Sequence, residues 1–294
     1  MFVLVAAAVL PLDEATAGTL DRVRQSGKLT LGYRTDARPF SYRDESGKAA
    51  GYSVALCERI ADQVKTELKL PALALEWVAL TLEERLRAVQ QGRVDLLCAA
   101  DAVTLSRRQD VSFSIPIFAD GIGALLRSDS PQALREVLSK GQAAPRPFWR
   151  ASPGQILQRK TFSVVANTTA EKWLAERLGT FRITATVAPV DSYDAGVQRV
   201  LNRTSDVMFG NRAILLDAAA RNPSARALIV LDRQFTYEPL GLVLQRNDDD
   251  FRLVVDRTLS QIFTSKELLP QYTRWFGTPD TNTLTFFHFT ALPE

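Results

Sequence analysis

The chain has 294 residues, 46% of them hydrophobic and 23% charged, with 15 Gly, 14 Pro and 2 Cys. This balance is typical of a globular protein and excludes disordered, collagen-like and disulfide-framework proteins. The net charge of +3 is spread along the chain, so it predicts no nucleic-acid partner. The Cys and His residues lack the spacing of a zinc site, and we expect neither a metal nor a cofactor. The length fits one large or two medium domains, and we expect two lobes.

The N-terminus has the pattern of an export signal. Residues 1–12 are almost wholly apolar, and Ala-Thr-Ala at 15–17 fits a signal-peptidase site. We therefore expect residues 1–17 to be a signal peptide and the mature protein to lie in the periplasm. No Lys or Arg precedes the apolar run, which departs from the usual signal, and the alternative is a buried first strand. The run is shorter than the roughly 20 apolar residues of a membrane span, and no later stretch reaches that length.

From residue 28 onward, short β-rich runs alternate with amphipathic helices. The helix expected at 54–68 shows this best, because apolar residues recur at every fourth position from Leu56 to Leu68. Apolar runs between such helices are typical of a parallel sheet that is covered on both faces. The first block has strands at 28–33, 75–79 and 94–99 and helices at 54–68 and 81–92, the second of which opens with a capping-box pattern.

The same order of elements restarts after residue 160. Between the two blocks, residues 128–160 are rich in Pro, Gln and Ser, and we expect a surface excursion there. Export permits a disulfide between Cys57 and Cys98, but the sequence does not decide whether they meet. The later strands are expected at 162–166, 183–187, 207–209 and 238–244. Helices are expected at 132–139, 170–178, 212–220 and 248–264, and a further helix ends at about residue 201.

Short segments along the chain carry a resemblance to a known family. They are 32–34 (GYR), 38–42 (RPFSY), 51–53 (GYS), Arg85, 92–96 (GRVDL), 106–108 (SRR), 113–116 (FSIP), 167–171 (NTTAE), 206–208 (DVM) and 275–276 (WF). In order and spacing they resemble the polar amino-acid-binding family of periplasmic solute-binding proteins, and most of all its glutamate/aspartate-binding branch. The similarity covers most of residues 19–280, although the excursion at 128–160 is longer than expected.

The resemblance implies an α/β fold of two lobes, each with its own sheet, joined by two hinge strands. In this family a small solute is clamped between the lobes. On this basis residues 18–123 and 237–294 form lobe 1, and residues 124–236 form lobe 2. The last strand and helix fit this arrangement, because the chain has to return to the first lobe.

The resemblance also indicates how the cleft binds an amino acid. Arg107 occupies the α-carboxylate position, where a guanidinium binds both oxygens. A helix N-terminus at Thr168 and Thr169 adds donors to the same anion. Arg34 and Arg85 match positions that hold the side-chain carboxylate in the acidic-amino-acid branch. Three arginines in one cleft predict an anionic ligand, and the alternative for each is a solvated surface charge.

The ammonium half of the site departs from the family. Gly210 stands where the family places the Asp that binds the ammonium, and Ser192 falls at the position of a His in the closest branch. Ala100 and Ala102 replace the usual Ser or Thr, with Asp101 between them. Either Asp101 binds the ammonium, or the ligand lacks one and is a dicarboxylate or another organic anion. We favour an acidic amino acid because it is the commoner ligand.

We therefore expect a monomeric solute-binding protein that passes a small anionic solute to the permease of an ABC importer. The rival hypothesis is an enzyme on the same fold. The cleft offers no His, no nucleophile with a base and no metal cluster, which leaves Asp101 and Asp36 as candidate acids or bases. A carboxylate beside three arginines is a poor general base, because their charge lowers its pKa. A sensor module that delivers its ligand to another protein is the third hypothesis.

Overall fold

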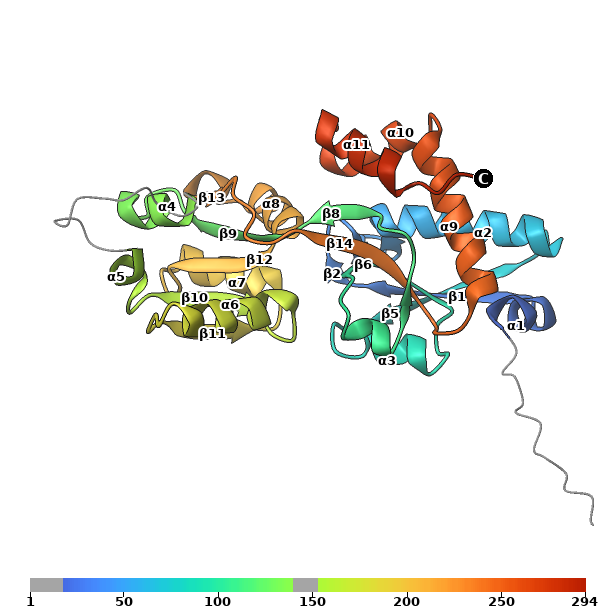
Figure 1. The fold of residues 1–294 in the computed structure, drawn as a ribbon, viewed down its shortest axis with the longest axis horizontal. Helices are drawn as coiled ribbons and strands as arrows, with labels where there is room; N and C mark the ends of the chain where they lie inside the picture. Colours follow the sequence, from blue (N-terminus) through green and yellow to red (C-terminus); the bar gives the residue numbers. More distant parts are fainter. Residues whose placement is uncertain (1–17, 140–152) are drawn as a thin grey trace, which may run out of the picture.

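The computed structural model describes residues 18–139 and 153–294. The predicted signal peptide, 1–17, and part of the predicted excursion, 140–152, lie outside the described residues. The fold is α/β, with one large sheet in each half of an elongated molecule and helices around both sheets (Figure 1). Within the described part of the chain, no helix combines the length and the apolar character needed to span a membrane.

The first sheet contains β1 (Lys28–Arg34), β5 (Ala74–Leu80), β6 (Leu96–Ala102), β7 (Ser112–Phe113), β8 (Phe118–Asp120) and β14 (Glu238–Leu244). Its strand order is β5-β1-β6-β14-β7, and β8 also pairs with β14. β1 is parallel to β5 and β6, whereas β14 is antiparallel to β6, β7 and β8. A small antiparallel sheet adjoins it, made of β2 (Asp36–Ala37), β3 (Ser41–Arg43) and β4 (Ala49–Ala50).

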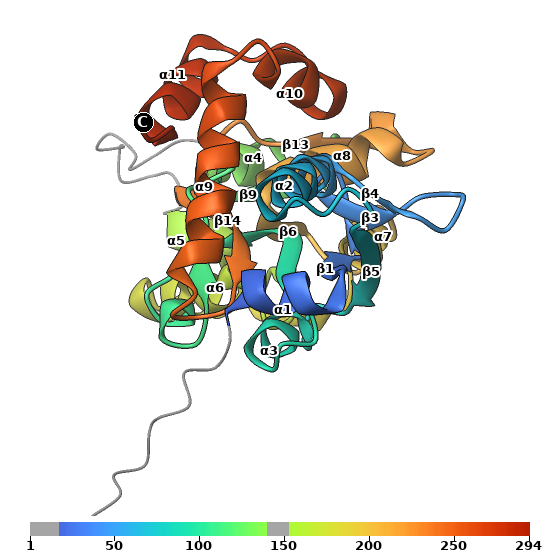
Figure 2. The same ribbon diagram turned by 90° about the vertical axis from the view of Figure 1, so that its right-hand side faces the viewer.

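The helices of this half pack on the sheet through apolar faces. Leu56, Ile60 and Val64 of α2 (Tyr52–Leu68) are fully buried, because residues at every fourth position share one side of a helix. The last two helices lie together at one end of the long helix that precedes them, where the chain ends (Figure 2). The helices are α1 (Thr19–Ser26), α2 (Tyr52–Leu68), α3 (Arg85–Gln90), the 3-10 helix η1 (Arg107–Gln109), α9 (Asp249–Thr264), α10 (Leu268–Phe276) and α11 (Thr281–Thr290).

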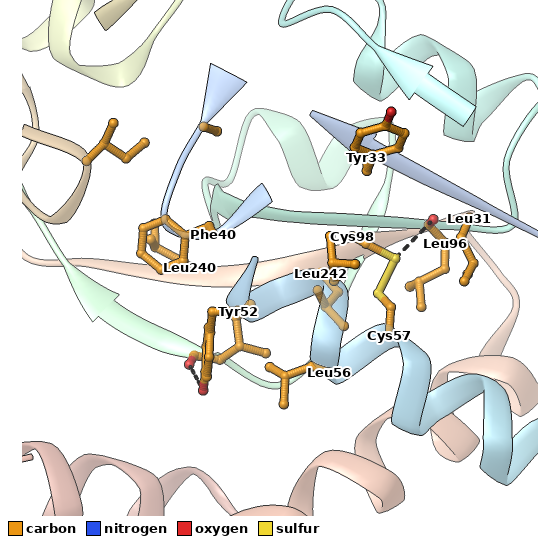
Figure 3. Close-up of a cluster of buried hydrophobic side chains, with 14 of the residues drawn as sticks. Leu31, Tyr33, Phe40, Tyr52, Leu56, Cys57, Leu96, Cys98, Leu240 and Leu242 are labelled. Atoms are coloured by element: carbon orange, nitrogen blue, oxygen red, sulfur yellow. Dashed lines mark hydrogen bonds between the residues drawn. A yellow bond between two sulfur atoms is a disulfide. The ribbon is translucent and has the colours of Figure 1, made fainter. Parts of the chain in front are cut away.

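A disulfide joins Cys57 of α2 to Cys98 of β6, with their Cα atoms 6.0 Å apart (Figure 3). Both cysteines are fully buried, among Leu31, Leu56 and Leu96. The structure thus forms the pair that the sequence left open. The bond closes a loop between residues 41 positions apart. Closing a loop of this length restricts the unfolded chain and stabilises the fold by about 4 kcal/mol.

The second sheet contains β9 (Ile122–Arg127), β10 (Thr161–Val165), β11 (Thr186–Val190), β12 (Val207–Asn211) and β13 (Leu228–Val230). Its order is β11-β10-β12-β9-β13, with β10 parallel to β11 and β12, and β9 antiparallel to β12 and β13. Its helices are α4 (Gln132–Ser139), α5 (Pro153–Leu157), α6 (Thr169–Thr180), α7 (Tyr193–Leu201), α8 (Arg212–Arg221) and the 3-10 helix η2 (Ala225–Ala227).

Several predicted boundaries differ from the structure, and two of the differences have a visible cause. The strand expected at 183–187 is β11 at Thr186–Val190. Pro189 is tolerated there because β11 lies at the sheet edge and has one neighbour. The reciprocal hydrogen bonds of the predicted capping box form, since the N–H of Thr81 donates to Glu84 Oε1 (3.1 Å) and the N–H of Glu84 to Thr81 Oγ1 (3.3 Å), but they do not open the helix at residue 81. The box forms a turn ahead of α3, which begins at Arg85.

The chain crosses between the halves at the β8–β9 junction and returns just before β14 (Figure 1). Gly121, between β8 and β9, lies directly against the returning segment. A Cβ atom on Gly121 would lie 1.8 Å from the carbonyl oxygen of Thr236. The N–H of Ile122 donates to Thr236 Oγ1 (2.9 Å), and the N–H of Phe235 donates to the carbonyl of Ile122 (2.8 Å). The two crossings therefore touch at a position where only glycine fits.

Replacing Gly121 with Ala should lower the free energy of unfolding by at least about 2 kcal/mol, because the new methyl group overlaps backbone atoms. Gly179→Ala is the matched control, since a Cβ there meets nothing within 4 Å. That variant should be slightly stabilised, because Ala favours the helix over Gly by about 0.5–1 kcal/mol. Urea unfolding measures both, and a Gly121→Ala protein as stable as the wild type would contradict the close crossing.

Asp120, the last residue of β8, is a buried acid at this crossing. Its carboxylate accepts the N–H of Ala213 in the first turn of α8 (3.1 Å) and the side-chain amide of Gln234 (3.4 Å). Burial raises the pKa of Asp120 to about 7, although these hydrogen bonds and the charge of Arg212 act in the opposite direction. The crossing thus contains a group that titrates near neutral pH.

The raised pKa of Asp120 predicts a pH-dependent stability. An unfolded Asp has a pKa of about 3.9, so between about pH 4 and 7 the folded protein holds a proton that the unfolded chain has released. The free energy of unfolding should fall as the pH rises through this window, by on the order of 2 kcal/mol between about pH 5 and 7. Asp120→Asn should lose this contribution. Urea unfolding curves of both proteins across the window test it, and parallel pH profiles would refute the raised pKa.

Candidate functional site

A cleft lies between the two halves, at the carboxyl ends of the parallel strands, where open α/β sheets bind ligands. Arg34 ends β1, Ala102 ends β6 and Val165 ends β10, and all three line the cleft. Apolar side chains form much of the wall, among them Phe40 and Ile214. Six predicted site residues meet here: Arg34, Arg85, Asp101, Arg107, Thr168 and Thr169.

Arg85 and Asp101 form a buried ion pair in the cleft wall. Arg85 Nε donates to Asp101 Oδ1 (2.7 Å), Nη2 lies 2.7 Å from the same oxygen, and Nη1 donates to the carbonyl of Leu82. Nε and Nη1 of Arg85 therefore donate hydrogen bonds to the protein, and Nη2 makes an ion-pair contact with Asp101. Burial alone would raise the pKa of Asp101, but Arg85 and Arg107 outweigh it and hold that pKa below its usual value. Asp101 is thus an ionised counter-ion for Arg85.

Arg107 is more loosely held. Its Nη1 donates to the carbonyl of Ala102 (2.8 Å) and lies 3.8 Å from Asp101 Oδ1. Burial lowers the pKa of Arg107, with Asp101 and Glu238 acting against this effect. Among the described residues, none accepts a hydrogen bond from its Nε or Nη2. Arg107 therefore keeps donors for a carboxylate.

Arg34 also keeps donors. Its Nε donates to Asp36 Oδ1 (2.8 Å), and Nη2 lies 2.6 Å from that oxygen without the angle of a hydrogen bond. Nη2 is buried and has no hydrogen-bond partner within residues 18–139 and 153–294. Because an unbonded buried donor is costly, this nitrogen favours a ligand acceptor.

Helix α6 points its N-terminus into the cleft from the second half. Thr168 caps it: its hydroxyl accepts the N–H of Glu171 (3.3 Å) and donates to the carbonyl of Val165 (2.7 Å). The Thr169 hydroxyl donates to Glu238 Oε2 (3.0 Å). Both hydroxyls thus have protein partners. The first N–H groups of a helix have no partner within it, and with the helix dipole they attract an anion.

Glu238 lines the cleft, although the sequence analysis did not single it out. It begins β14, and its Oε1 accepts the hydroxyl of Thr236 (3.0 Å). The N–H of Val103 donates to the carbonyl of Pro239 (2.9 Å), which places the start of β14 beside the segment that leads to Arg107. In the described ranges, no Lys or Arg forms an ion pair with Glu238. The sequence offered one signal for Glu238. It is an acidic residue at the start of the apolar strand by which the chain returns to the first half.

The two other predicted residues, Ser192 and Gly210, do not line the cleft. Ser192 caps α7, where its hydroxyl accepts the N–H of Ala195 (3.2 Å). A Cβ on Gly210 would lie 2.8 Å from the ring of Tyr193. Tyr193 and Asn211 line the cleft in their place, joined by a hydrogen bond from the N–H of Asn211 to the Tyr193 hydroxyl (3.1 Å).

Comparison with known proteins gives the family. The profile of the bacterial extracellular solute-binding proteins, family 3, matches residues 29–278. The L-glutamate/L-aspartate-binding protein of Pseudomonas aeruginosa is 27% identical over 91% of this chain and 82% of its own length. The L-cystine-binding protein TcyJ of Escherichia coli is 21% identical over 90% of this chain and 88% of its own. A solved structure of the ancestral amino acid-binding protein AncCDT-1, a precursor of cyclohexadienyl dehydratase, has a TM-score of 0.70 and 22% identity, covering 88% of this chain and 100% of its own.

Proposed function

Because the chain belongs to family 3 of the bacterial extracellular solute-binding proteins, we propose that it captures an acidic amino acid in its cleft and delivers it to the permease of an ABC importer. The observation that carries the ligand class is the pair of arginines with remaining donors, Arg107 and Arg34. Arg107 and the N-terminus of α6 bind the α-carboxylate from the two halves. Arg34 binds the side-chain carboxylate, whereas Arg85 forms an ion pair with Asp101. The relative that binds glutamate and aspartate supports this ligand.

Capture proceeds by closure of the two lobes, 18–123 with 237–294 and 124–236. Arg38 pairs with Asp217 of α8 (3.1 Å), and Thr169 of α6 bonds Glu238 of β14, so contacts already join the two halves. A ligand that touches both lobes stabilises the closed form, because only that form offers all its contacts. The permease then docks on the closed lobes. The protein acts as a monomer.

The role is binding rather than catalysis, and the place of action is the periplasm. The relatives named above are binding proteins. Asp101 is held ionised by Arg85 and Arg107, which lower its pKa, and so it is a poor general base near neutral pH. The disulfide between Cys57 and Cys98 supports an oxidising compartment outside the cytoplasm.

Replacing Arg107 with Ala tests the carboxylate site. Arg108→Ala is the matched control, because Arg108 is its exposed neighbour and does not line the cleft. We expect Arg107→Ala to weaken L-glutamate and L-aspartate binding by about 100-fold or more, since two charge-assisted hydrogen bonds are lost. Arg108→Ala should bind as the wild type does. Isothermal titration calorimetry measures both, and equal affinities for the two variants would rule out the assignment.

A further inference from the structure

An amino acid brings an ammonium into the cleft, and a buried ammonium needs an anionic partner. Asp101, one of the two carboxylates that line the cleft within residues 18–139 and 153–294, already has partners. Its Oδ1 accepts Arg85 Nε at 2.7 Å and lies 3.8 Å from Arg107 Nη1. An ammonium would have to compete there with two guanidiniums. These contacts of Asp101 fall on Oδ1, and an ammonium at its Oδ2 would share the carboxylate's charge with two guanidiniums, so Asp101 is a weaker partner for the ligand's amine than an acid without an ion pair.

The position of Gly210 cannot supply the missing acid either. A side chain there would begin 2.8 Å from the ring of Tyr193. Tyr193 is itself fixed, because it is buried and accepts the N–H of Asn211. The ring thus fills the space that an acidic side chain at 210 would need, and the second half of the molecule offers no carboxylate to the cleft among its described lining residues.

Glu238 is the remaining carboxylate of the lining. Its two oxygens each accept one threonine hydroxyl at 3.0 Å, from Thr169 and from Thr236. A carboxylate has about four lone-pair positions, so acceptor capacity remains on both oxygens. The two hydroxyls also hold the carboxylate in one orientation. Unlike Asp101, it forms no ion pair with a described Lys or Arg. Its charge also acts on Arg107, the group proposed for the α-carboxylate, so a ligand with both charges can bind between the two.

The place of Glu238 matches the dimensions of an α-amino acid. In such a molecule, one carbon atom separates the ammonium from the carboxylate, so the two subsites must be neighbours. The bond between Thr169 and Glu238 puts Glu238 beside the N-terminus of α6. The bond between Val103 and Pro239 puts it beside the segment that carries Arg107. Both groups proposed for the α-carboxylate are thus adjacent to Glu238.

We propose that Glu238 binds the α-ammonium of the ligand, so the cleft selects α-amino acids over dicarboxylates and other anions that lack an amine. This inference rests on the proposed function and deepens it. In this arrangement the partner of the ammonium lies on β14, the strand by which the chain returns to the first lobe, and not at position 210 of the second lobe. The bond to Thr169 then joins this partner to the second lobe, so that ammonium binding and closure involve the same carboxylate.

The test compares ligands that differ only at the amine: L-glutamate with L-2-hydroxyglutarate, and L-alanine with L-lactate. Each is titrated by calorimetry into the wild type, Glu238→Gln and the control Glu83→Gln, which makes the same charge change at an exposed position outside the lining. The wild type and Glu83→Gln should bind the amino acid of each pair about 10- to 150-fold more tightly than the hydroxy acid. This ratio corresponds to the free energy of a hydrogen bond to a charged group. Glu238→Gln should lose this preference while keeping its affinity for the hydroxy acid.

Several outcomes would overturn the assignment. If Glu238→Gln keeps the full preference for the amine, another group binds the ammonium. If the wild type binds both members of a pair equally, the cleft does not read the amine. Loss of binding to both members in Glu238→Gln, with an unchanged melting temperature, would make Glu238 a general support of the site. If L-alanine binds more tightly than L-lactate but L-glutamate does not bind, the role of Glu238 is supported and the proposal of an acidic ligand is wrong. If no probe binds the wild type, the proposed function fails and this inference fails with it.

Discussion

The cleft is organised by the requirement that a buried charge have a partner. Asp101 is the anionic partner of Arg85, with its Oδ1 2.7 Å from Nη2 of Arg85. The same oxygen lies 3.8 Å from Nη1 of Arg107 and partly balances that charge as well. Removing one member of such a buried pair typically costs about 3–5 kcal/mol, so these groups are committed to the protein. The groups left for a ligand are the remaining donors of Arg107 and of Arg34, which also pairs with Asp36, the N-terminus of α6, and the carboxylate of Glu238. Counting arginines in the sequence overstates the positive charge that a ligand meets.

The crossing of the two connecting strands sets where these groups lie. The hydrogen bonds of Ile122 with Thr236 and Phe235 hold the two crossings together, and the ends of strands from both sheets line one cleft. The core around the Cys57–Cys98 disulfide supports the site from the first half. The disulfide joins α2 to β6, and β6 carries Asp101. Because β14 returns beside β6, the same crossing places Glu238 next to Arg107.

Sequence reasoning predicted the family and the α/β fold, because hydrophobic periodicity and a series of spaced motifs extend over most of the chain. Both predictions are confirmed. It brought Arg34, Arg85, Asp101 and Arg107 to one place, but could not show which of their charges neutralise one another, since that depends on side-chain distances. Glu238 was missed for a related reason: in the sequence it is only the first residue of a strand. Its bond to Thr169 joins residues 69 positions apart.

The most direct test of this account is a crystal structure of the protein with L-glutamate bound. The account predicts the ammonium within hydrogen-bond distance of Glu238, the α-carboxylate on Arg107 and the first N–H groups of α6, and the side-chain carboxylate on Arg34. Asp101 should keep its bond to Arg85. An ammonium bound to Asp101, with Glu238 turned away from the ligand, would contradict the account.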